Sequence, residues 1–180
     1  MKPQLKEKIY ISIIALLIAL SAQFYFTYRY QPAREVQIFY NQEHELNQEI
    51  MKVIREADKK VYFAIYTFTR LDIKNALIGA KYRGVEVAGV VDRNQVEDIE
   101  LQRKIVEELR KADIPVYEHS HSAIMHLKAV VSEKAYASGS YNWTLAGTND
   151  NDEILEVGQD EGIRKQYEEI LEKLIEKYHN

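Results

Sequence analysis

The chain has 180 residues, of which 46% are hydrophobic, and this is enough for one domain with a substantial core. It contains no cysteine, which excludes disulfide bonds, thiol catalysis and cysteine-ligated zinc. The first thirty residues hold four Lys or Arg and one Glu, which leaves 20 basic and 27 acidic residues and a formal charge of −7 from residue 31 onward. Proteins that bind nucleic acid nonspecifically usually carry a positive excess, so this balance counts against such a partner without excluding a local basic groove.

The N-terminus predicts a membrane segment. Residues 9–28 form an apolar run with only four polar interruptions, and 20 residues are enough to span a bilayer. We expect residues 1–30 to be an uncleaved single-pass anchor, with the catalytic domain outside the cytoplasm because three lysines precede the run. The alternative is a signal peptide cleaved near Ser21, which would give a secreted protein. Residues 31–35 are predicted to be a short linker.

From residue 36 to residue 180, strand-like and helix-like segments alternate along the chain. Short apolar or β-branched runs predict strands at 36–40, 61–68, 85–91, 116–117, 124–131 and 154–157. Helical periodicity predicts helices at 46–57, at 72–83 with Asp72 as a possible cap and Gly84 as the stop, at 99–112, and over a C-terminal stripe made of Tyr167, Ile170, Leu171, Leu174, Ile175 and Tyr178. Residues 144–148 predict a turn or a short helix. This alternation predicts a single α/β domain, a mixed sheet with helices on both faces.

Within the run 124–131, strand alternation places His126 and Lys128 on one face. The other face would carry the apolar residues Met125, Leu127, Ala129 and Val131, and we expect it to be buried. A solvent-facing strand would explain a His-x-Lys pair on its own. The residues that follow favour a site instead.

Ser138, Ser140 and Asn142 repeat at period two after that run, and Gly139 permits a bend or a close backbone approach. A second short strand ending there would bring a hydroxyl and an amide beside His126 and Lys128. Such a group suits an anionic oxygen centre. The lysine would supply a fixed charge, the amide and hydroxyl would donate hydrogen bonds, and the imidazole would titrate near neutrality.

These residues resemble a known family. The pattern comprises His126-x-Lys128, the acid Glu133, Gly139-Ser140-x-Asn142 and Asn151-x-Glu153. It resembles the HKD motif of the phospholipase D superfamily, and above all its single-motif Nuc-type endonucleases and the mitochondrial phospholipase D (Zucchini) group. The resemblance extends from about Val36 to the C-terminus. There are two departures, because Glu133 replaces the usual aspartate and the step from it to Gly139 is one residue short.

The resemblance implies the phospholipase D/nuclease-like sandwich and a metal-independent phosphodiesterase that uses no cofactor and forms a phosphohistidine. It implies catalytic roles for His126, Lys128 and Glu153, phosphate binding by Lys128, Ser140 and Asn142, and support of the motif by Glu133 and Gly139. In-line displacement needs acid–base groups on both sides of phosphorus, and the chain holds one His-x-Lys copy. We therefore expect a homodimer with a composite active site. A second histidine of the same chain, His119 or His121, is the alternative acid.

Three other interpretations remain open at this stage. His119, His121 and His126 could form a metal site, although histidines in a polar loop are more often solvated. The acidic stretch 149–153 superficially resembles a calcium-binding loop, but it lacks the central glycine and the distal glutamate of an EF-hand. Tyr141 and Trp143 could stack on a base, but we expect them to be packing residues.

Three hypotheses about the function follow from this resemblance. The first hypothesis is an endonuclease acting on DNA or RNA, and the second is a phospholipase acting on a membrane lipid such as cardiolipin. The third is a catalytically silent, membrane-tethered dimer that only binds phosphate groups. Basic residues around the site would favour nucleic acid, whereas an apolar rim would favour lipid.

Overall fold

The computed structural model describes residues 3–29 and 36–179, so the predicted linker at 31–35 lies outside the described residues. The chain forms two compact units, Met1–Arg34 and Glu35–Asn180. In the first unit, α1 (Pro3–Arg29) is one continuous helix. Its stretch Lys8–Tyr25 is long and apolar enough to cross a membrane, and none of that stretch is buried. These properties of length and composition are shared by signal sequences.

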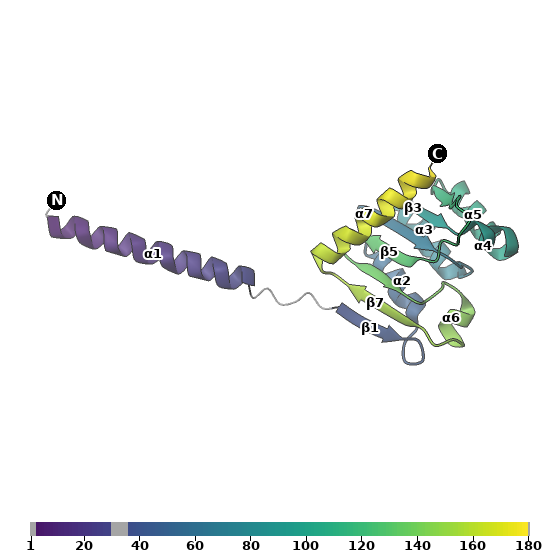
Figure 1. Ribbon diagram of the computed structural model, residues 1–180, viewed down its shortest axis with the longest axis horizontal. Helices are drawn as coiled ribbons and strands as arrows, with labels where there is room; N and C mark the ends of the chain where they lie inside the picture. The colour runs from purple at the N-terminus through teal and green to yellow at the C-terminus, as the bar shows by residue number, and fades with distance from the viewer. Residues whose placement is uncertain (1–2, 30–35, 180) are drawn as a thin grey trace. The chain divides into compact units, whose positions relative to one another are not determined.

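The second unit is built on a seven-stranded mixed sheet with the order β1-β7-β6-β5-β2-β3-β4 (Figure 1). The strands are β1 (Val36–Tyr40), β2 (Lys60–Ile65), β3 (Glu86–Val91), β4 (Val116–Glu118), β5 (Lys128–Ser132), β6 (Tyr136–Gly139) and β7 (Ile154–Gly158). The strands β2, β3 and β4 run parallel to one another. The strand β5 runs antiparallel to β2, β6 to β5, β7 to β6, and β1 to β7. The carboxyl ends of β2 and β6 and the amino ends of β5 and β7 therefore lie at one edge of the sheet.

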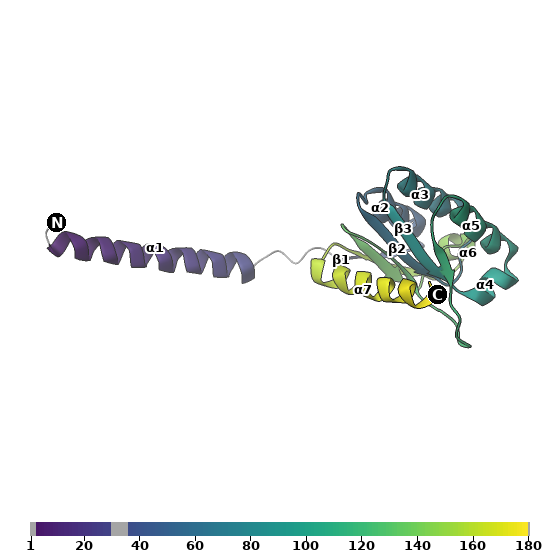
Figure 2. The same cartoon turned by 90° about the horizontal axis from the view of Figure 1, so that it is seen from above.

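Helices cover both faces of this sheet, as the alternating pattern predicted. They are α2 (Leu46–Arg55), α3 (Leu71–Tyr82), α4 (Arg93–Asp98), α5 (Glu100–Lys111), α6 (Leu145–Asn149) and α7 (Glu161–Tyr178). Seen from above in Figure 2, α7 lies against one face, and α2, α3 and α5 lie against the other. Two buried apolar clusters result, one between the sheet and α2, α3 and α5, and one beneath α7.

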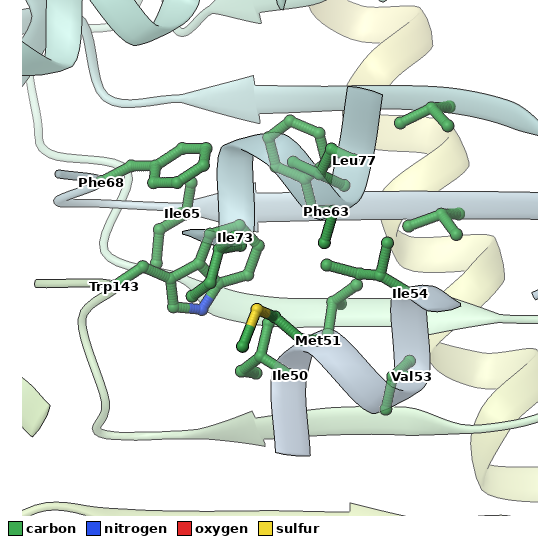
Figure 3. Packing of buried hydrophobic residues seen from close by; sticks show 14 of the residues in the cluster. Ile50, Met51, Val53, Ile54, Phe63, Ile65, Phe68, Ile73, Leu77 and Trp143 are labelled. Carbon is green, nitrogen blue, oxygen red and sulfur yellow. The ribbon is translucent and has the colours of Figure 1, made fainter. Parts of the chain in front are cut away.

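The larger cluster contains aromatic residues from β2 and from the segments that follow β2 and β6. Figure 3 shows Phe63, Phe68 and Trp143 in the same cluster as the helical residues Ile50 and Leu77. The Phe68 and Trp143 rings meet edge to face with centroids 4.9 Å apart, and Phe63 lies 5.8 Å from Trp143. Such pairs add to the stabilisation that burial provides. The expectation that Trp143 is a packing residue is confirmed, because only 1% of it is exposed. The same holds for Tyr141, which is fully buried.

The structure differs from the predicted fold in several details. The helix α4 was not predicted, because its six residues are too few to show a period. The strand β2 ends at Ile65 rather than at residue 68. Asp72 does not cap α3, since it lies in the first turn and pairs with Arg70. Ile170 belongs to the predicted α7 stripe but is 53% exposed, because Leu171 takes the position that faces the sheet.

A pair of glycine substitutions tests the packing of this unit. A Cβ on Gly89 in β3 would lie 2.3 Å from the Phe63 ring, so Gly89→Ala should lower the unfolding free energy by about 1–3 kcal/mol through overpacking. Gly79 in α3 has no atom nearer than 4.0 Å to such a Cβ, so Gly79→Ala should raise it by about 0.5–1 kcal/mol. Denaturant unfolding of the full-length chain can be followed by the fluorescence of Trp143, its only tryptophan. Equal stability of the two variants would contradict this account of the core.

Candidate active site at one sheet edge

Strand pairing gathers the predicted site residues, except Glu133, at one edge of the sheet. Lys128 opens β5 opposite Ile65, the last residue of β2. On the other side of β5, Ala129 pairs with Ser138 of β6. Gly139 then pairs with Leu155 of β7. His126, Ser140, Asn142 and Glu153 all lie within three residues of these strand ends, so segments far apart in sequence converge here.

His126 lies in a loop and not in the predicted strand. The sequence predicted one strand over 124–131 with Leu127 buried, but β5 begins at Lys128 and Leu127 is 41% exposed. The cause is the end of β2, where Tyr66 N donates to Leu127 O at 2.9 Å and the ladder goes no further. The strand β5 is also buried on both faces, so alternation within it creates no solvent-facing side. The His126 side chain is exposed at the edge of the sheet.

Lys128 is a buried cation beside this imidazole. It is 7% exposed, and its Nζ donates to His126 O at 3.1 Å. The ring of Tyr66 lies 5.3 Å from Nζ and 4.8 Å from the His126 ring, between centroids in the second case. Burial lowers the pKa of Lys128, and the nearby charge of Glu153 partly opposes that shift. The arrangement holds a positive charge where an anion bound at His126 would meet it.

Asn142 presents a free donor at the same edge. Its Oδ1 accepts a hydrogen bond from Thr67 N at 3.2 Å, which fixes the orientation of the amide. Within the part of the chain that the structure describes, its Nδ2 has no hydrogen-bond partner. An amide held in this way can donate to a bound oxygen. The Asn142 side chain therefore has the geometry of an anion ligand.

Ser140 and Glu153 form a second group. The Ser140 hydroxyl donates to Glu153 Oε2, and its oxygen accepts from Ile154 N at 3.1 Å. Asn151 Nδ2 donates to Glu153 Oε1 at 3.3 Å. Among the described residues Glu153 makes no hydrogen bond with His126, so the carboxylate is held in place without orienting that imidazole within the chain. The hydroxyl proton of Ser140 is likewise committed to Glu153.

Gly139 allows this second group to form. A Cβ at this position would lie 2.2 Å from Ile154 O, so only a glycine permits β6 and β7 to approach this closely. Of the two alternatives predicted for Gly139, a bend or a close backbone approach, the structure has the close approach. The approach brings Ser140 to the residues that begin β7.

Three polar residues that position the site were missed in the sequence. Asn41, at the end of β1, accepts from Glu153 N through its Oδ1 and donates to Asn151 O at 2.6 Å. Gln102 is fully buried and accepts from Phe68 N at 2.7 Å. Gln95 contacts the segment that follows β2. Gln102 could have been found, because it interrupts the apolar stripe of α5, but nothing in the sequence marks Asn41 or Gln95.

The chain matches one family model over most of its length. The model described as "Cardiolipin synthase, PLD-like domain" matches residues 50–175. The chain belongs to the phospholipase D superfamily. The Nuc protein of Salmonella typhimurium, a phospholipase D family member, has a crystal structure that superposes with a TM-score of 0.72 and 26% identity. The match covers 77% of this chain and 92% of that chain.

Two curated relatives carry names that describe lipid chemistry. Mitochondrial cardiolipin hydrolase of Xenopus tropicalis is 28% identical over 130 residues, which are 72% of this chain and 60% of that protein. Phospholipase D of Rickettsia typhi is 28% identical over 119 residues, which are 66% of this chain and 57% of that protein. The chain therefore spans less than two thirds of the length of either relative.

The histidines before the motif do not form a metal site with it. His119 is 2% exposed, and both ring nitrogens have backbone partners, Arg93 N at 3.0 Å and Ala123 O at 2.7 Å. Its ring lies 4.5 Å from that of His121, between centroids. In the described residues, no group of three or more His, Cys, Asp or Glu side chains is arranged to hold a metal ion.

Glu133 lies at the far end of β5 from His126. Its carboxylate accepts hydrogen bonds from the backbone N–H groups of Asp58, Lys59 and Lys60 at 2.7, 3.2 and 3.2 Å. Burial by itself would raise the pKa of this carboxyl, but these donors outweigh it and lower the pKa below its usual value of 4.5. Glu133 thus fixes the entry to β2, the strand whose other end carries Tyr66.

This arrangement predicts a pH-dependent loss of stability in Glu133→Gln. The variant should lose about 1 kcal/mol of unfolding free energy at pH 7, because one amide oxygen replaces two charged acceptors. Since the folded pKa is depressed, the stabilisation is present above the unfolded value near 4.5 and is lost as the pH falls through the folded value. The difference in unfolding free energy between wild type and Glu133→Gln should therefore decrease as the pH is lowered. Glu133→Asp, which keeps the carboxylate, is the control, and a gap that does not change with pH would refute the assignment.

Proposed function

We propose that this protein hydrolyses phosphodiester bonds through a phosphohistidine intermediate, without a metal ion or cofactor. The observation that carries the proposal is the grouping at one sheet edge of an exposed imidazole, a buried ammonium and a free amide donor, supplied by His126, Lys128 and Asn142. Membership of the phospholipase D superfamily supports it.

The reaction has two in-line steps. In the first step, a nitrogen of His126 attacks phosphorus, the bond to the leaving oxygen breaks, and a second imidazole gives that oxygen a proton. In the second step, the same imidazole takes a proton from water, and the water oxygen attacks phosphorus. The P–N bond then breaks and His126 is released. One diester and one water thus give a phosphomonoester and an alcohol.

The other residues stabilise charge or hold these groups. Lys128 and Asn142 would bind the non-bridging oxygens, where negative charge develops. Glu153 would orient an imidazole by accepting its N–H. Because its hydrogen bonds within the chain go to Ser140 and Asn151, we assign that imidazole to a second subunit. Ser140 would act on substrate through Glu153, and Glu133 and Gly139 would support the strands that carry the site.

The second imidazole is proposed to come from a second copy of the chain. A two-fold axis through the site would place the two copies of His126 on opposite sides of one phosphate. His119 is a poor alternative, because it is buried and both ring nitrogens are hydrogen-bonded. His121 is exposed and remains the candidate acid from within one subunit.

Nucleic acid is proposed as the first substrate class. The similarity to Nuc covers 92% of that chain, whereas the lipid-named relatives are covered over 60% and 57% of their length. Arg93 is exposed and follows β3 at the same edge of the sheet, where it could contact a neighbouring phosphate. An endonuclease acting on DNA or RNA is therefore the leading proposal.

A phospholipase acting on a lipid such as cardiolipin is the second candidate, and the rim of the site favours it. Ile124 and Leu127, which flank His126, are 50% and 41% exposed, and Leu145 near Asn142 is 63% exposed. Exposed apolar side chains beside a phosphate-binding group suit an amphiphilic substrate. Two curated relatives are a cardiolipin hydrolase and a phospholipase D.

Both candidates are compatible with a membrane location. We propose that residues 1–30 anchor the protein by a single span, that 31–35 form the linker, and that the catalytic domain of residues 36–180 lies outside the cytoplasm. The apolar stretch Lys8–Tyr25 supports the anchor. Cleavage after this segment would release the same domain as a secreted protein.

The first test is turnover without metal. Full-length protein should cleave labelled DNA, RNA or cardiolipin vesicles equally well with and without EDTA, because the charge on the phosphate is met by Lys128 and Asn142. His126→Ala should lower turnover by at least about 1,000-fold and leave the fold intact, since its side chain is exposed. Cleavage that EDTA abolishes and a divalent ion restores would overturn the phosphohistidine. Binding of all three ligands without cleavage would instead support a silent phosphate-binding dimer.

The second test concerns the composite site. Wild-type and His126→Ala subunits, co-expressed with different tags, should form heterodimers that are nearly inactive in multiple turnover, because their shared site lacks one imidazole. Homodimers of wild type purified through the same two tags are the control. Heterodimers that keep about half the wild-type activity, or a fully active monomer, would show that each chain works alone.

A further inference from the structure

The loop that delivers His126 is held from inside the protein. Residues 119–127 connect β4 to β5, and His126 lies near the end of this loop. Two polar side chains that contact this loop are almost completely buried, Asp92 at 0% exposure and His119, the first residue of the loop, at 2%. They directly follow β3 and β4, and His119 N donates to Val91 O at 3.2 Å. The sheet therefore fixes both side chains at their base.

The Asp92 carboxylate joins two backbone segments. Its Oδ2 accepts from Met125 N at 2.8 Å, and its Oδ1 accepts from Gln95 N at 3.0 Å in the first turn of α4. The Met125 side chain is itself 4% exposed and packs beneath α7. The residue that precedes His126 is thus held through both its backbone and its side chain.

His119 holds the same loop two residues earlier. Its Nδ1 accepts from Arg93 N at 3.0 Å, so the ring proton lies on Nε2, which donates to Ala123 O at 2.7 Å. The imidazole therefore bridges the start of α4 and the loop.

Asp92 reaches the site by a second route through α4. Gln95, fixed at the capped start of that helix, donates from Nε2 to Tyr66 OH at 3.2 Å and accepts from Thr67 Oγ1 at 2.8 Å. Tyr66 packs against the His126 ring, and Thr67 N orients the amide of Asn142. Through Gln95, the Asp92 carboxylate is thus connected to the residues that contact His126 and Asn142.

We propose that Asp92 and His119 are positioning residues, which set the place of the His126 imidazole by holding the backbone at residues 123 and 125. The inference rests on the function proposed above. A helix cap alone would require only one oxygen of Asp92, and it would require nothing of His119 Nε2. The hydrogen bonds to the loop are the part that a capping role does not explain. Because a displacement of about 1 Å costs roughly 100-fold in rate, the effect of losing these bonds should be large.

Two matched substitutions of His119 test its hydrogen bond to Ala123 O separately from its hydrogen bond with Arg93 N. The oxygen of an asparagine can occupy the position of ring Nδ1 and keep Arg93 N bonded, but nothing then reaches Ala123. The amide nitrogen of a glutamine can occupy the position of Nε2 and keep the bond to Ala123 O. With bis(4-nitrophenyl) phosphate and full-length protein, His119→Asn should lower kcat by about 10–100-fold with KM within about two-fold. His119→Gln should restore most of kcat.

Equal kcat in His119→Asn and wild type, or an equal loss in both variants, would overturn the proposal, since either result removes the link to Ala123. Asp92→Ser gives a measurement that does not need catalysis. Serine keeps an acceptor for Gln95 N but does not reach Met125. Amide hydrogen exchange should therefore accelerate at Met125 and stay slow at Gln95. Unchanged protection at Met125 would refute the role of Asp92.

The exchange measurement also separates this inference from the proposed function. A wild-type protein that cleaves no phosphodiester would refute the function, while faster exchange at Met125 in Asp92→Ser would still show that Asp92 holds the loop. Conversely, an active wild type with unaltered kcat in His119→Asn would refute the positioning role and leave the phosphodiesterase proposal standing.

Discussion

The antiparallel pairing of β5 with β2 is the constraint on which the site depends. It places Lys128 opposite Ile65, so the chain that leaves β2 and the chain that enters β5 lie side by side at the same edge. Since β6 and β7 continue the antiparallel series, their polar ends reach that edge as well. A shift of one residue in the register of β5 would turn every side chain in it to the opposite face of the sheet. The geometry of the site is therefore a consequence of strand register, reinforced where Glu133 fixes the start of β2.

Stability and chemistry compete at Lys128. A buried ammonium is unfavourable for folding, and burial accordingly lowers its pKa. Its compensation within the chain is modest, namely one carbonyl, the face of Tyr66 and the more distant charge of Glu153. A phosphate anion would complete this set and relieve the cost of the buried charge. Charged residues that are poorly compensated within the chain are typical of functional sites, where a ligand supplies the missing interaction.

Much of this fold was predictable from the sequence, because periodic helices such as α5 and α7 and continuous apolar strands such as β3 carry their own signal. The site residues were also recognisable, since the HKD pattern is local in sequence. Two features were not predictable. The exposure of Leu127 follows from where β2 ends, and no pattern inside residues 124–131 records that. The support from Asn41, Gln95 and Asp92 comes from sequence-distant side chains, whose role appears only once the strands are paired.

The same architecture explains why one family can act on nucleic acids and on lipids. Three residues are proposed to act on the phosphate group, namely His126, Lys128 and Asn142. A phosphodiester is common to both substrate classes. The scaffold that holds these residues consists of the sheet and of the loops at the ends of its strands. Discrimination must then come from the exposed rim, where Arg93 and the apolar side chains Ile124 and Leu145 lie on loops and helix ends. Loops tolerate substitution far better than paired strands do. Substrate choice in this fold can therefore change while the register that builds the catalytic group stays fixed.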